Sequence, residues 1–112
     1  MTIIQKEKNG IMELSISGRL DAVSAVEADK DFNSVIDDGH ENLLVDLARL
    51  DYISSAGLRV LLVVAKRIQQ SGGKVVLCAL SANVKEVFEI SGFSSIFSIF
   101  PTNEEAIKFL KA

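Results

Sequence analysis

The first twenty residues carry the hydrophobic pattern of two β-strands. Residues 3–6 form one short strand-like stretch, and in residues 11–17 apolar and polar residues alternate. Asn9-Gly10 lies between the two stretches and is a dipeptide that favours a tight hairpin turn. The pattern therefore predicts two antiparallel strands that lie next to each other.

The rest of the chain alternates between helical and strand-like patterns. Apolar residues recur at helical spacing in four segments, and nearly continuous apolar runs typical of buried strands lie between them. We expect helices at about 21–38, 55–70, 82–91 and from 101 onward, strands at 43–47, 74–78 and 96–100, and a connection at 48–54. This order predicts one α/β domain over residues 1–112. We expect a mixed sheet of about five strands, covered by about four helices. The strands form an antiparallel N-terminal hairpin and then βαβ units.

Composition and charge narrow the functional classes. An apolar fraction of 48% is ordinary for a folded domain, and no apolar run is long enough to span a bilayer. The net charge of -3 provides no basic field that would hold nucleic acid or anionic lipid. The single cysteine, Cys78, cannot form an internal disulfide and is expected to be a small buried hydrophobe. With no signal peptide at the start, these features predict a cytoplasmic protein.

The segment Asp51–Arg59 joins a buried strand to a long helix and is the most informative part of the chain. Ligands and partners often contact α/β proteins at such strand-to-helix turns. Ser54 or Ser55 falls at the start of the helix, where serine commonly caps the free backbone N–H groups. Simple capping, nucleophilic catalysis and phosphorylation are the three interpretations of these hydroxyls.

Nucleophilic catalysis has little support. Gly-x-Ser-x-Gly turns also connect a strand to a helix, but Ile53 stands where the first glycine belongs. The single histidine, His40, lies in a polar turn before the strand that leads to Ser55, and we expect it to be a solvated loop residue at the other end of the sheet. A catalytic triad needs its histidine in contact with the serine. No residues have the spacing of a metal or phosphate-loop motif, so we expect no metal and no cofactor.

Phosphorylation fits the apolar surroundings of the two serines. A phosphate at a helix start meets free N–H groups and adds about -1.5 to -2 charge. The surrounding residues are apolar, namely Ile53, Ala56, Val60, Val63 and Val64. Either neighbouring helices bury the valines, or these residues form a face that binds another protein.

Several segments together resemble a known family. Gly18-Arg19-Leu20-Asp21 is similar to a Gly-x-Leu-Asp turn, and the stretch from Tyr52 to Leu58 is similar to a signature around a phosphorylated serine. Residues 44–47, 72–74 and 84–93 match later parts of the same pattern. In this order and spacing the segments resemble the STAS domain family, and within it the anti-sigma factor antagonists of bacteria. The resemblance covers nearly the whole chain.

This resemblance implies a partner switch. The unmodified antagonist binds an anti-sigma factor that is also a serine kinase of the GHKL type, which frees a sigma factor. Phosphorylation by this kinase releases the antagonist, and a PP2C-type phosphatase reverses the modification. By position the phosphoacceptor is Ser55, and Ser54, which stands where aspartate is common in the family, is the competing hydroxyl. The Asp21 carboxylate matches an aspartate near the site, or alternatively it caps the first helix.

The sequence thus predicts a regulatory protein and no enzyme. The expected partner-binding residues are Asp21, Ile53, Ser54, Ala56, Gly57, Val60, Val63 and Val64, beside the phosphoacceptor Ser55. The alternative is a STAS scaffold or regulatory subunit of another complex, such as a stressosome or a lipid-transport system.

Overall fold

A five-stranded mixed sheet forms the centre of the protein, whose computed structural model describes residues 1–111. The strands follow the chain order across the sheet. The first two are antiparallel, and each later pair is parallel. Their bounds are β1 (Thr2–Lys8), β2 (Ile11–Leu20), β3 (Asn42–Ile53), β4 (Lys74–Cys78) and β5 (Ser98–Phe100). The predicted α/β fold with an N-terminal hairpin is therefore confirmed.

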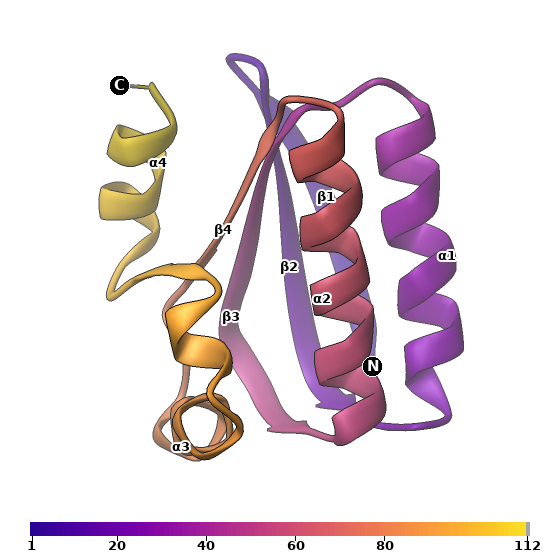
Figure 1. Ribbon diagram of the computed structural model, residues 1–112, viewed down its shortest axis with the longest axis vertical. Helices are drawn as coiled ribbons and strands as arrows, with labels where there is room; N and C mark the ends of the chain where they lie inside the picture. Colours follow the sequence, from indigo (N-terminus) through magenta and orange to yellow (C-terminus); the bar gives the residue numbers. More distant parts are fainter. Residues whose placement is uncertain (112) are drawn as a thin grey trace.

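Helices cover both faces of this sheet. Figure 1 shows two helices side by side against one face, α1 (Ser24–Asp37) and α2 (Ser55–Gln70), with α4 (Asn103–Lys111) on the opposite side. The remaining helix, α3 (Ala82–Ser91), packs with the cluster that contains α1 and α2, and a short 3₁₀ turn (Phe93–Ser95) follows it. Two neighbouring parallel strands need such a crossover helix between them, because the chain must return to the starting edge of the sheet before the second strand begins.

The alternation of side chains along β3 explains why its first half, residues 43–47, is apolar at almost every position. Leu43, Val45 and Leu47 belong to the large cluster under α1, α2 and α3, whereas Leu44 belongs to the smaller cluster under α4. All four side chains are fully buried. Each contributes about 1.5–3 kcal/mol relative to an exposed position, so this strand anchors the turn that follows it.

The predicted connection at 48–54 is wrong, because β3 continues as a strand to Ile53. The strand is extended by pairing with β2, which itself runs to Leu20, and the register between them shifts near Ser17 and Gly18. These irregularities break the simple alternation in this part of β3, which is why a sequence pattern does not reveal it. The last strand is shorter than expected, since the 3₁₀ turn ends just before it.

Among residues 1–111, no helix combines the length and the apolar character that a bilayer crossing requires.

Candidate functional site

Two adjacent serines at the start of α2 have different structural roles. Ser54 is the N-cap, with an extended backbone, and its hydroxyl oxygen accepts a 3.3 Å hydrogen bond from the N–H of Gly57. Ser55 is the first residue of the helix and is exposed. Within the described residues we find no hydrogen bond to the Ser55 hydroxyl. Capping therefore occupies Ser54, and Ser55 presents a free hydroxyl to the surface.

Close packing fixes the position of this helix start. A Cβ atom on Gly57 would lie 2.8 Å from the carbonyl oxygen of Leu20 and 2.9 Å from the Ile53 side chain. Heavy atoms do not approach that closely without displacement, so this position requires glycine. The absence of a side chain lets the first turn of α2 rest directly on the end of β2, which places Ser55 at a defined point of the surface.

Asp21 organises the neighbouring turn between β2 and α1. Its Oδ1 atom accepts hydrogen bonds from the N–H groups of Val23, at 3.1 Å, and Ser24, at 3.0 Å. The Ser24 backbone bond is the main cause of a lowered pKa for the Asp21 carboxyl, and the nearby Arg19 lowers it further. These bonds hold N–H groups just before and at the first residue of α1, whereas the N-cap position itself is Val23, which has no side-chain cap hydrogen bond. Oδ1 is committed to this turn, while Oδ2 lies 4.0 Å from the Nε atom of Arg19.

A cation stacked on an aromatic ring lies at the same end of the sheet. The guanidinium carbon of Arg19 is 4.1 Å from the ring centroid of Tyr52, and the two residues are direct partners in the β2–β3 register. Tyr52 is 40% exposed although it is a large side chain. Sequence reasoning missed this pair because the register shift that brings the residues together is not visible in the sequence.

An apolar groove of about 750 Å³ runs between α1 and α2 and begins at Ser55. Two valines that line it remain exposed, Val26 by 62% and Val63 by 42%. The lining combines small and apolar side chains with one cation and one carboxylate, from Ala22, Ala25, Val26, Asp29, Ser55, Ala56, Arg59, Val60 and Val63. An exposed apolar surface of this kind, rimmed by polar groups, is typical of a site that binds another protein.

The groove contains only part of the residue set expected from the sequence. Ala56, Val60 and Val63 line it, as a partner-binding face requires. Ile53, Gly57 and Val64 are buried in the core and do not line the groove, and Val60 is itself only 8% exposed, so the role of these residues in partner binding stays a prediction. Val64 is 2% exposed and lies four residues before Ile68 on the core-facing side of α2.

The α1 wall of the groove was not anticipated. The signal that could have revealed it is Val26, an apolar residue that falls outside the stripe of Ala25, Ala28 and Phe32 that faces the core. Apolar side chains off the core stripe of a helix are candidates for a second contact.

Two other candidate groups lie away from the groove. His40 precedes β3 and Ser55 follows it, so the strand separates them, as expected. The histidine is not fully solvated, however: its side chain is 19% exposed and its Nδ1 atom lies 3.5 Å from a carboxylate oxygen of Glu7. Residues 1–111 contain no group of three or more His, Cys, Asp or Glu side chains that could hold a metal ion.

Cys78 is fully buried on the sheet face under α4, as predicted. Burial raises the pKa of its thiol to about 12, and the carboxylates of Asp46 and Glu13 raise it further in the same direction. A protonated, inaccessible thiol is unreactive, so this cysteine acts as a core residue.

Comparison with known proteins gives a consistent result. The family model described as "STAS domain" matches residues 2–106. The chain is 40% identical to BtrV of Bordetella bronchiseptica, which is assigned as an anti-sigma factor antagonist, over 99% of this chain and 96% of BtrV.

Solved structures share the fold. A protein of Thermotoga maritima, 22% identical, superposes with a TM-score of 0.93 over 98% of this chain and 95% of its own. The phosphorylated form of the Bacillus cell fate determinant SpoIIAA, 20% identical, superposes with a TM-score of 0.75 over 96% and 97%.

Proposed function

The chain belongs to the STAS domain family and is an anti-sigma factor antagonist, and on this basis we propose how it binds and releases its partner. The anti-sigma factor docks on the α1–α2 groove, and phosphorylation of Ser55 ends the complex. Proteins of this class are regulators and not enzymes. The same class binds anti-sigma factors, so the groove is assigned to a partner of that kind.

One observation carries the proposal: Ser55 is an exposed, free hydroxyl at the mouth of an apolar groove, while the neighbouring Ser54 caps the helix. A kinase needs an accessible hydroxyl, and a switch needs that hydroxyl at the docking surface. Within this turn the combination favours Ser55 over Ser54.

The effect of phosphorylation follows from two opposite electrostatic terms. A phosphate adds about -1.5 to -2 charge at neutral pH. Within the isolated domain it faces the N–H groups and the positive dipole of the α2 N-terminus, which favour an anion. In the complex the same charge must be buried against apolar side chains, which costs several kcal/mol if it stays unpaired. A loss of about 2.8 kcal/mol weakens binding roughly a hundredfold.

The enzymes that set the phosphorylation state form the second part of the proposal. The anti-sigma factor is itself the serine kinase, of the GHKL type, and a PP2C-type phosphatase restores the free hydroxyl. The protein acts in the cytoplasm, and its net charge of -3 argues against nucleic acid or an anionic membrane surface as its partner.

Mass spectrometry after incubation with the cognate kinase tests the phosphoacceptor. We expect one phosphate on Ser55 in the wild type and in Ser54→Ala, and none in Ser55→Ala. Phosphate on Ser54, with Ser55→Ala still fully modified, would overturn the assignment. Circular dichroism of each variant provides the control that the substitutions leave the domain folded.

A further inference from the structure

We propose that Arg59 is the internal counter-ion of a phosphate on Ser55, and that binding this phosphate withdraws its guanidinium from the α1–α2 groove. The inference rests on the proposed phosphorylation of Ser55 and adds a second change to the docking surface. It assigns a role to the one cation that lines the groove.

Helix geometry places the two residues together. Arg59 follows Ser55 by four residues on α2, and residues four apart in a helix are neighbours, with Cβ atoms about 5–6 Å apart. Side chains in a helix lean toward its N-terminus, so Arg59 leans toward the turn that carries Ser55. An acidic group four residues before a basic one is also the favourable order along a helix.

Arg59 is available for this contact. The three ion pairs found within residues 1–111 are formed by Arg19, His40 and Arg67, and none involves Arg59. Arg19, the other cation at this end of the sheet, is stacked on Tyr52. The exposed guanidinium of Arg59 is therefore free to bind, and its planar fork suits phosphate oxygens in a bidentate contact.

The contact between Arg59 and the phosphate changes the charge that the groove presents to a partner. Without phosphate, the Arg59 side chain lines the groove together with Val60 and Val63 on its own helix and Asp29 from α1. A phosphate dianion on Ser55 attracts the Arg59 guanidinium more strongly than the Asp29 carboxylate does. Arg59 and Asp29 form no ion pair within 4.0 Å in the part of the chain that the structure describes. Phosphorylation thus adds negative charge at the mouth of the groove and removes positive charge from its wall.

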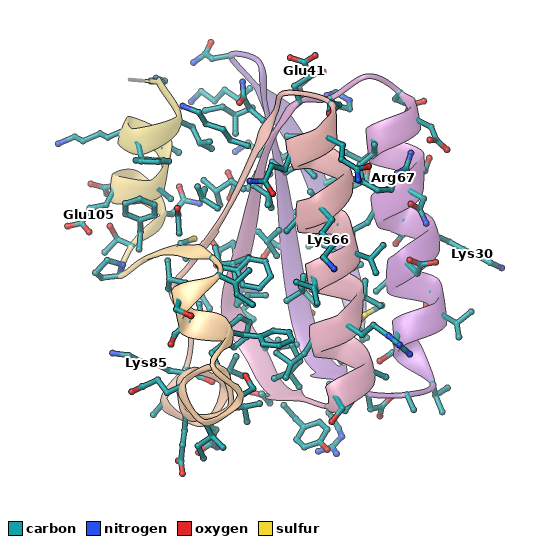
Figure 2. All side chains as sticks on the ribbon, in the orientation of Figure 1. Lys30, Glu41, Lys66, Arg67, Lys85 and Glu105 are labelled. Atoms are coloured by element: carbon teal, nitrogen blue, oxygen red, sulfur yellow. The ribbon has the colours of Figure 1, made fainter. Side chains whose placement is uncertain are left out.

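The test uses protein in which phosphoserine is incorporated directly at position 55 by genetic encoding, so that it does not depend on any kinase. The second pKa of the phosphate is measured by ³¹P NMR titration in the wild-type background, Arg59→Lys, Arg59→Ala and the control Lys66→Ala. Lys66 projects from α2 in Figure 2 and lies eleven residues beyond Ser55, about 17 Å along the helix axis. Both alanine variants remove one positive charge from the same helix.

A neighbouring cation stabilises the dianion and lowers this pKa, so removing it must raise the pKa. We expect Arg59→Ala to raise it by roughly 0.2–0.7 pH unit, the range of an exposed ion pair. Lys66→Ala should leave it unchanged, and Arg59→Lys should give an intermediate value. The Nε–H signal of Arg59 should also shift between the unmodified and phosphorylated proteins.

Equal pKa values in the wild type and Arg59→Ala, or equal shifts in Arg59→Ala and Lys66→Ala, would overturn the proposal. An unmoved Arg59 Nε–H signal would do the same. These results are readable whether or not a kinase modifies Ser55, so a failure of the proposed function and a failure of this inference are distinguishable.

Discussion

The backbone N–H of Ser54 donates a 2.9 Å hydrogen bond to the carbonyl oxygen of Leu20, which joins the start of α2 to the end of β2. The bond ties the helix that carries Ser55 to the turn that leads into α1. This bond therefore helps to fix the position of the two walls of the groove relative to each other, and Ser55 is one of the residues that line it.

The two serines should respond differently to substitution by alanine. Ser54→Ala removes the N-cap and should lower the free energy of unfolding by about 0.5–2 kcal/mol. Ser55→Ala removes an exposed hydroxyl without a hydrogen-bond partner and should change it by less than about 0.5 kcal/mol. Urea denaturation of both variants measures the difference. Equal destabilisation would contradict the division of roles between the two residues.

Gly57→Ala should be more damaging than its small volume suggests. The added Cβ would meet the Leu20 carbonyl oxygen and the Ile53 side chain, so the first turn of α2 must shift. Overpacking of this kind lowers stability by about 1–3 kcal/mol. Thermal melting, with Ser55→Ala as the control at the same helix start, checks the expectation. A fully stable variant would show that α2 can move without loss.

The sequence predicted the sheet and helices well because most of their patterns are local. Near Ser55, capping chemistry and the apolar surroundings also pointed to the site. The groove itself needed the structure, since its α1 wall comes from Ala25, Val26 and Asp29, which lie nearly thirty residues before Ser55 in the chain. Burial of Ile53 and Val64 could not be separated from exposure of Val63, because all three are simply apolar residues until the packing of α2 is known.

The exposed valines should contribute to binding rather than to folding. Val26→Asp and Val63→Asp each place a charge in the groove and should weaken the complex with the anti-sigma factor at least tenfold. Ile90→Asp is the matched control, since Ile90 is 79% exposed on α3 and does not line the groove. Calorimetric titration of the three variants measures the affinities, and melting curves check the fold. Comparable losses in all three would mean that the groove is not the docking site.

Cys78 should make the protein less stable in alkali. Its thiol stays protonated in the folded state up to a pKa of about 12, whereas the unfolded chain ionises near the ordinary value of 9.0. Between these values the unfolded state has lost its proton and the folded state has not. Stability therefore falls as pH rises, by up to about 1.4 kcal/mol per pH unit from this group. Urea denaturation at several values between about pH 8 and 11 measures this effect. The free energy of unfolding should decline less steeply with pH in Cys78→Ala than in the wild type, and identical slopes would contradict the pKa shift.

The central claim is that a phosphate on Ser55 separates binding from folding. Its most direct test is calorimetric titration of the anti-sigma factor with unmodified and Ser55-phosphorylated protein, with melting curves of both forms. The account predicts that affinity falls on the order of a hundredfold while the melting temperature stays the same or rises slightly. Unchanged affinity, or a large drop in melting temperature on phosphorylation, would contradict it.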